Sequence, residues 1–129
     1  MADRLEIEQL IRALHAARMD EQLDELCRLF CPDAHFRVAG SSAGKAIAIS
    51  AVGAAEIRTW LSIMVKTFKL TGYELLSMAI DETEGAAAVH WRAQIHSKIT
   101  GITVVTELVD LVRMGESGIA SYVELFVPH

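Results

Sequence analysis

Apolar residues recur at intervals of three and four in two long stretches of the first half of the chain, a spacing that predicts helices with one buried face. These stretches cover residues 4–18 and 54–69, and Asp3 can cap the first of them with Glu6 three residues later. A shorter helix is expected between them, and Pro32 stops it because proline cannot continue a helix. The inner positions are Ile7, Leu10, Ile11 and Leu14 in the first helix, Leu23, Leu26, Cys27 and Phe30 in the second, and Ile57, Trp60, Leu61, Met64, Val65 and Phe68 in the third.

From Leu70 onward the pattern changes to strands separated by tight turns. Two short strands are also expected in the first half of the chain. Long antiparallel strands joined by short turns form a meander, and the three helices must then cover one of its faces. With no repeat, low-complexity tract or linker, the sequence predicts a single α+β domain over residues 1–129. The expected strands are residues 34–38, 46–49, 72–80, 86–98, 102–113 and 119–127.

Composition narrows the class of protein. A chain of 129 residues that is 52% apolar can bury a core and does not have the composition of a disordered protein. No uninterrupted apolar stretch approaches the roughly 18 residues of a membrane span. A net charge of −5 without a basic stripe argues against nucleic acid as a partner. The charged start of the chain and two cysteines, read as reduced thiols, favour a cytoplasmic protein.

Four short motifs occur in an order that resembles a known superfamily. Together they resemble the SnoaL-like polyketide cyclases, the ketosteroid isomerases and the limonene epoxide hydrolases of the nuclear-transport-factor-2-like superfamily. The resemblance implies a curved sheet wrapped around helices as a cone with an apolar pocket, in a homodimer. No cofactor or metal is expected. The superfamily also contains proteins without catalytic activity. The motifs are residues 33–40 (DAHFRVAG), 53–61 (GAAEIRTWL), 87–91 (AAVHW) and 108–113 (LVDLVR).

The resemblance carries over only part of each known catalytic set. Asp110 matches the protonated Asp that holds the substrate oxyanion in ketosteroid isomerases. The proton-moving Asp of those enzymes falls on Val38 and their Tyr falls on Leu14, which argues against steroid isomerisation by that mechanism. Glu124 matches a catalytic Asp of the epoxide hydrolases, whose Arg-x-Asp pair is missing from residues 72–80.

The last two strands supply the candidate chemistry. If residues 114–118 form a five-residue turn, Asp110 lies opposite Tyr122, and both share a face with Glu124. Two neighbouring carboxyl groups in an apolar pocket cannot both ionise cheaply, so one stays protonated as a donor while the other accepts a proton. Asp110 would hold a ligand oxygen, Glu124 would move the proton, and Tyr122 would orient either carboxyl group. Alternatively, Asp110 is a satisfied structural carboxyl and Glu124 lies at a wet rim or a dimer face.

The expected pocket walls are the large apolar residues of the inner faces, each of which could equally be plain core. They are Leu14, Phe36, Val38, Trp60, Met64, Trp91, Leu108 and Phe126.

Histidine and cysteine give weaker signals. His90 and His96 alternate on the face opposite Trp91 and are expected on the convex side of the sheet. Pro32 lies between Cys31 and His35, so Cys27, Cys31 and His35 cannot share one helical face, and their spacing matches no zinc motif. His15 lies beside the apolar stripe of the first helix and is expected to be a half-buried packing residue.

Two functions remain open from the sequence. The first is a cofactor-free acid/base isomerase, cyclase or dehydratase that acts on an apolar carbonyl-bearing or polycyclic metabolite. The second is a non-catalytic member of the same fold that binds a small apolar molecule or serves as a dimerisation domain. The incomplete catalytic sets favour the second, and the polar row of Asp110, Tyr122 and Glu124 favours the first.

Overall fold

A computed structural model describes residues 3–42 and 45–127. Asp3 caps the first helix as expected, its carboxylate accepting a hydrogen bond of 2.8 Å from the Glu6 amide. The elements are helices α1 (Arg4–Met19), α2 (Leu23–Arg28) and α3 (Ala54–Thr67) and strands β1 (Phe30–Ser42), β2 (Lys45–Val52), β3 (Phe68–Asp81), β4 (Ala86–Ser97), β5 (Thr103–Gly115) and β6 (Gly118–Phe126).

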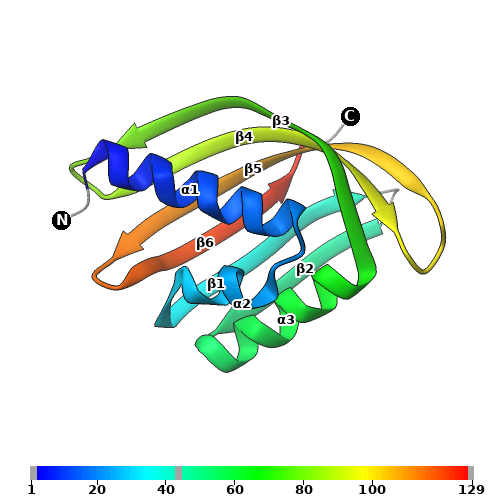
Figure 1. The fold of residues 1–129 in the computed structure, drawn as a ribbon, viewed down its shortest axis with the longest axis horizontal. Coiled ribbons are helices and arrows are strands. Elements are labelled where there is room, and N and C mark those ends of the chain that lie inside the picture. Colours follow the sequence, from blue (N-terminus) through cyan, green and yellow to red (C-terminus); the bar gives the residue numbers. More distant parts are fainter. Residues whose placement is uncertain (1–2, 43–44, 128–129) are drawn as a thin grey trace.

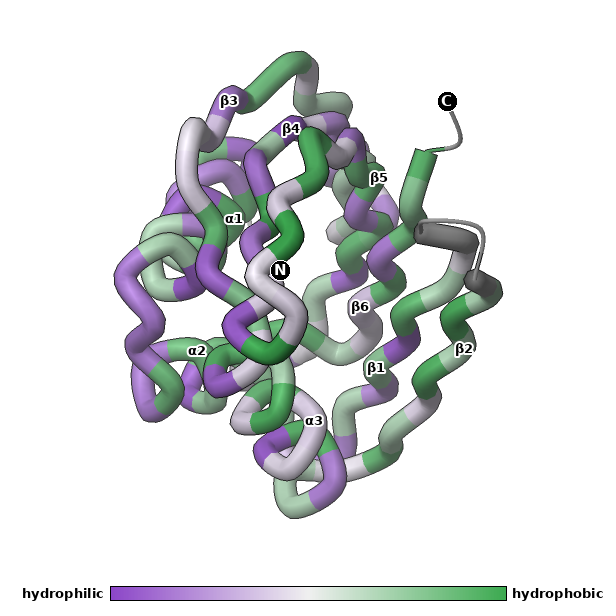
Figure 2. The backbone as a smooth tube through the Cα atoms, turned by 90° about the vertical axis from the view of Figure 1, so that its right-hand side faces the viewer, coloured by the Kyte–Doolittle hydropathy of each residue, from purple (hydrophilic) through white to green (hydrophobic). Residues whose placement is uncertain are grey.

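The strands form one mixed sheet in the order β2-β1-β6-β5-β4-β3 (Figure 1). The pair β1–β6 is parallel and the other neighbours are antiparallel. The sheet curls from β3 round to β2, and the three helices lie on the side that it encloses (Figure 2). The predicted α+β class and the curved sheet around three helices are confirmed.

Local irregularities bend the strands of this sheet. Pairing of β3 with β4 shifts register twice, between Thr71 and Glu74 and again between Leu75 and Ser77. Pairing of β1 with β6 shifts between Phe30 and His35, around Pro32, which has no amide hydrogen to offer a neighbouring strand. Such interruptions increase twist and let a sheet wrap around what it covers.

Several boundaries and one register differ from the sequence expectations. The second helix ends at Arg28, before Pro32, and Phe30 and Pro32 belong to β1 instead of the helix and its stop. The third helix ends at Thr67, and Phe68 and Lys69 begin β3 instead of extending the helix. The predicted pairing of Asp110 with Tyr122 is wrong, because Asp110 lies opposite Glu124 and Val112 lies opposite Tyr122. The turn is shorter than predicted, and a bulge follows it. Because the error is two residues and side chains alternate, Asp110, Tyr122 and Glu124 still share the inner face.

Helix α1 connects two groups of buried side chains. Its C-terminal part, including Leu14, packs with α2, α3, β1 and β2. Its N-terminal part, including Ile7 and Ile11, packs with β3, β4 and β5. Within the described ranges, no helix is long and apolar enough to cross a membrane.

Candidate active site

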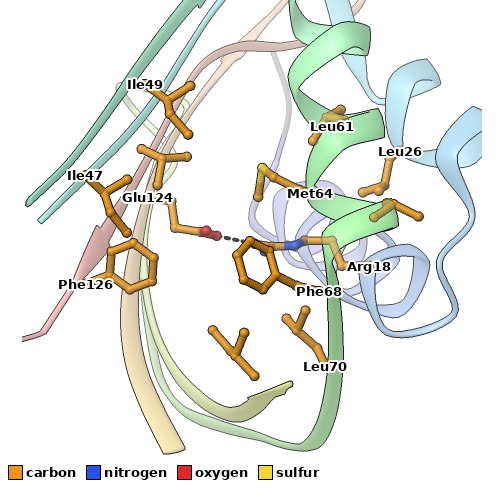
Figure 3. Close-up of a pocket in the computed structure, with 13 residues that line it drawn as sticks. Arg18, Leu26, Ile47, Ile49, Leu61, Met64, Phe68, Leu70, Glu124 and Phe126 are labelled. Atoms are coloured by element: carbon orange, nitrogen blue, oxygen red, sulfur yellow. Dashed lines mark hydrogen bonds and ion pairs between the residues drawn. The ribbon is translucent and has the colours of Figure 1, made fainter. Parts of the chain in front are cut away.

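A cavity of about 120 Å³ lies between the sheet and α3 (Figure 3). All but two of its lining residues are apolar, and the two exceptions are Arg18 from α1 and Glu124 from β6. Figure 3 shows the Glu124 carboxylate pointing across the cavity toward Arg18. The apolar lining consists of Leu26, Val38, Ile47, Ile49, Leu61, Met64, Val65, Phe68, Leu70, Ile95 and Phe126.

Strand register places Glu124 against this cavity. Val38 lies opposite Ile49 on one side and opposite Glu124 on the other, and Glu124 lies opposite Asp110 in the next strand. Directly opposed residues share a face of the sheet. One row therefore crosses the inner face, with apolar side chains in β2 and β1 and carboxyl groups in β6 and β5: Ile49, Val38, Glu124 and Asp110. Strand pairing therefore brings the two carboxyl groups together on the inner face.

Glu124 is buried and held by two hydrogen bonds. The residue is 1% exposed, and its Oε1 atom accepts hydrogen bonds from the Arg18 Nη1 group and, at 2.9 Å, from the Tyr122 hydroxyl. Arg18 is itself fixed, because its guanidinium carbon lies 5.2 Å from the centre of the Trp91 ring, and Tyr122 stacks on Phe36 at 5.6 Å between ring centres. These contacts hold the carboxylate in one orientation at the edge of an apolar cavity.

A second hydrogen-bonded group lies next to the first. The Nε2 atom of His15 is 2.8 Å from Oδ2 of Asp110, and its Nδ1 atom is 2.6 Å from the Tyr73 hydroxyl. His15 is 1% exposed and Asp110 is fully buried, whereas Tyr73 reaches the surface in part. The three side chains form a continuous hydrogen-bonded chain from the partly exposed Tyr73 to the carboxyl group opposite Glu124.

Burial controls the protonation of this cluster. Desolvation, and then the nearby Arg18 charge, lowers the pKa of His15 to about 3, so His15 is neutral at physiological pH. Burial raises the pKa of both Asp110 and Glu124, while the Arg18 guanidinium opposes the rise at each. Burial also raises the pKa of Tyr122 well above its ordinary value, with the two carboxylates adding to the effect. The direct bond from Arg18 to Glu124 makes Glu124 the carboxyl group that ionises first.

Two polar atoms near this cluster lack partners. Within the described residues, Asp110 Oδ1 and Trp91 Nε1 are buried without a hydrogen bond. A carboxylate oxygen without a partner is far more costly in the interior than the carbonyl oxygen of a neutral acid. The geometry therefore favours a protonated Asp110 beside an ionised Glu124.

The arrangement was compared with known proteins. No protein family model matches the sequence, and no curated protein matches it. Solved structures do match over nearly the whole chain. The epoxide hydrolase/cyclase-like enzyme SalBIII, described for pyran ring formation in the polyether salinomycin, has a TM-score of 0.77 at 17% identity and covers 98% of this chain and 95% of its own.

Two further structures agree with that match. An NTF2-like protein from Burkholderia xenovorans LB400 has a TM-score of 0.75 at 16% identity, covering 94% of this chain and 88% of its own. An LEH-like epoxide hydrolase from M. tuberculosis has a TM-score of 0.71 at 12% identity, covering 94% and 82%. The chain has the nuclear-transport-factor-2-like fold. At these identities the likeness establishes the fold and leaves the activity open.

Within this nuclear-transport-factor-2-like fold, the sequence-predicted site residues divide into two groups. Glu124, Val38, Met64 and Phe126 line the cavity. The others lie in the packed layers around it and are not part of its lining. These are Asp110, Tyr122, Leu14, Phe36, Trp60, Trp91 and Leu108.

Sequence reasoning missed Arg18 and underestimated His15. His15 is not half-buried as predicted: it is almost completely enclosed and bonded on both ring nitrogens. Arg18 follows Leu14 by four residues and therefore continues the apolar stripe of α1. A charged residue at a core-facing position of a helix was the signal that could have identified it.

The remaining candidates lie apart from the cavity. His90 is 3.4 Å from the Glu107 carboxylate, and His96 is 2.8 Å from the Thr103 hydroxyl. Cys27 and Cys31 are both free thiols. In the part of the chain that the structure describes, no three His, Cys, Asp or Glu side chains are grouped to hold a metal ion.

Proposed function

We propose that this protein is an acid/base enzyme that moves a proton next to a carbonyl group of a small apolar compound. The observation that carries the proposal is Glu124, a buried carboxylate oriented by Arg18 and Tyr122 and directed into an apolar cavity. A carboxyl group with a raised pKa in an apolar pocket is a typical general base or acid.

The expected chemistry begins with proton abstraction. Glu124 takes a proton from the carbon beside the carbonyl group, and the electron pair moves to the carbonyl oxygen. The Arg18 guanidinium, which meets the Glu124 carboxylate in the lining of the cavity, stabilises the resulting oxyanion. Where a C=C bond is conjugated with the enolate, return of the proton from Glu124 to its far carbon gives isomerisation. Where the enolate carries a β-hydroxyl group, the same proton lets that group leave as water, which gives dehydration. Attack of the enolate carbon on a second carbonyl group, whose oxygen then takes the proton, gives cyclisation.

Asp110 has a supporting role in this proposal. The sequence hypothesis gave Asp110 direct contact with a ligand oxygen. In the structure it lies opposite Glu124 in the next strand and does not line the cavity. A protonated Asp110 leaves Glu124 as the ionised member of the pair and adds no second negative charge beside it. Tyr122 orients Glu124 through its 2.9 Å hydrogen bond.

The second function, non-catalytic binding of an apolar molecule or dimerisation, is less well supported. Apolar walls are sufficient to bind an apolar molecule, and a buried ion pair in such a wall costs desolvation energy without adding affinity. The structural neighbours described as an epoxide hydrolase/cyclase-like enzyme and an LEH-like epoxide hydrolase also favour an enzyme. The homodimer stays a prediction.

Exchange of carbon-bound hydrogen tests the proposal without knowledge of the natural substrate. Small ketones such as cyclopentyl methyl ketone are incubated with the protein in D₂O, and loss of the α-hydrogen signal is followed by NMR. The wild type should accelerate exchange, and Glu124→Gln should reduce the enzymatic rate by about 10²-fold or more, since it removes the base.

A matched control uses the outer face of the same sheet. Glu107 lies on β5 beside His90, away from the cavity, so Glu107→Gln should leave the exchange rate unchanged. Thermal unfolding of each variant establishes that it is folded. An exchange rate that is the same in the wild type and Glu124→Gln would exclude Glu124 as the base.

A further inference from the structure

The volume of the cavity limits the size of its ligand. At about 120 Å³ it is slightly smaller than an engineered cavity of about 150 Å³ that binds benzene. Pockets for drug-sized ligands are roughly 300–1,000 Å³. A compound of one ring fits this space, whereas a polycyclic compound of the kind included in the sequence hypothesis exceeds it.

The walls hold the cavity at this size from both sides. On the sheet side, Val38, Ile49 and Glu124 belong to strands that are hydrogen-bonded to one another. Phe126 packs closely against β1 at Gly40, where a Cβ atom would lie only 3.0 Å from the Phe126 Cβ atom. On the other side, Leu61 is a buried residue of α3 that packs in the core. The lining is open where α3 passes into β3, since Phe68 is 37% exposed. A ligand larger than the cavity would therefore leave part of its apolar surface outside it.

The charges around the cavity limit the ligand's own charge. The guanidinium of Arg18 is already bonded to the Glu124 carboxylate, and the carboxyl group of Asp110 lies opposite Glu124 in the next strand. A carboxylate ligand would bring a third acidic group into this site and lose its hydration in an apolar cavity. A neutral carbonyl oxygen can accept a hydrogen bond from the remaining N–H groups of Arg18 without that cost.

We propose that the cavity selects a neutral compound of about one ring that carries a carbonyl oxygen, and that it discriminates against carboxylates and polycyclic ketones. Arg18 is the residue that recognises the oxygen, and the apolar lining receives the ring. This selectivity deepens the proposed function, because it assigns a substrate class to the same cavity.

Binding measurements with three compounds of matched size test the charge selectivity. Cyclopentyl methyl ketone, cyclopentanecarboxylate and isopropylcyclopentane share a ring and a branched substituent and differ in polarity. At pH 7.5 the ketone should bind at least about tenfold more tightly than the carboxylate. The apparent affinity for the carboxylate should fall about tenfold for each pH unit above its own pKa, because the neutral acid is the form that binds.

A steroid ketone tests the size limit. It should show no saturable binding to the wild type at concentrations that saturate with the one-ring ketone. Equal affinity for the steroid ketone and the one-ring ketone, or for the ketone and the carboxylate, would overturn the proposal.

Replacing the buried ion pair tests the role of Arg18. Arg18→Met alone leaves Glu124 buried without a partner and can unfold the protein, whereas Arg18→Met combined with Glu124→Leu removes both charges and is expected to fold. The double variant should still bind isopropylcyclopentane. The ratio of ketone affinity to hydrocarbon affinity should fall about tenfold relative to the wild type, as expected for loss of one charge-assisted hydrogen bond.

The outcomes separate this inference from the proposed function. Ketone binding with the expected selectivity but without hydrogen exchange would leave the inference standing and overturn the function. Hydrogen exchange catalysed equally well on the steroid ketone and the one-ring ketone would support the proposed function and overturn the inference. An unchanged affinity ratio in the double variant, or no binding of any probe, would overturn the inference.

Discussion

His15 is a base that the fold keeps neutral, and its neutrality has a measurable consequence. The pKa of His15 is lowered from 6.5 to about 3 by burial and by Arg18. Between these values the unfolded chain binds a proton at this position and the folded chain does not. The His15 contribution is therefore complete above pH 6.5 and is lost progressively as the pH falls toward 3, by about 1.4 kcal/mol per pH unit.

Comparison with His15→Gln isolates this effect. Denaturant unfolding of both proteins between pH 7.5 and 5 should show the wild type losing about 2 kcal/mol relative to the variant between pH 6.5 and 5. Asp110 and Glu124 have raised pKa values and act in the opposite direction, but both proteins contain them. A stability difference that stays constant over this range would show that His15 is not held neutral.

The sequence identified the carboxyl groups of the site but not the groups that bind them. Asp110 and Glu124 were found because they match catalytic acids of the families that the sequence resembles, and because the predicted hairpin puts them on one face. His15 and Arg18 lie on the core-facing side of α1, which periodicity does show. Their partners come from β5 and β6, about a hundred positions away, and helical periodicity contains no information on which strand packs against a helix turn.

At the scale of secondary structure, alternation predicted which face each strand residue occupies but not which residues pair. Side chains repeat every two positions along a strand, so pairings that differ by two residues present the same faces. The β5–β6 hairpin illustrates this, because Asp110 pairs with Glu124 instead of the predicted Tyr122. The turn length and the bulge after Ile119 decide the pairing. This turn contacts the end of α2, where the Ile119 amide donates a hydrogen bond of 2.8 Å to the Leu29 oxygen.

Gly118 is the turn residue where that contact is closest. Its φ angle is 142°, and a Cβ atom built there would lie 2.5 Å from the Leu29 backbone oxygen. Gly118→Ala should therefore destabilise the protein by about 2 kcal/mol or more, since either the turn or the end of α2 must shift. Denaturant unfolding measures the loss.

Gly101 provides the matched control for this substitution. It also has a positive φ angle, 77°, but nothing lies within 4 Å of a Cβ atom at that position. Gly101→Ala should cost about 1 kcal/mol, the penalty for the backbone conformation alone. Equal losses for the two variants would contradict the steric role of Gly118.

At the scale of the molecule, the site lies where the two halves of the core meet. Helix α1 packs its first half against β3–β5 and its second half against β1, α2 and α3, and His15 and Arg18 follow Leu14 near this junction. A buried polar cluster there is enclosed from both sides. The cavity between α3 and the sheet is left beside it, lined mostly by aliphatic side chains that leave a small volume unfilled.

Filling this cavity should therefore remove ligand binding without dismantling the core. A ligand of the folded state at about 100 times its dissociation constant adds about 2.7 kcal/mol of stability, which for a domain of this size raises Tm by roughly 10 °C. Met64→Trp places an indole ring in the cavity and should abolish this increase for cyclopentyl methyl ketone. Ile63→Trp adds a similar ring on the exposed side of α3, where Ile63 is 46% exposed, and should retain it. Thermal unfolding with and without the ketone measures both variants, and an increase that persists in Met64→Trp would place the ligand outside the cavity.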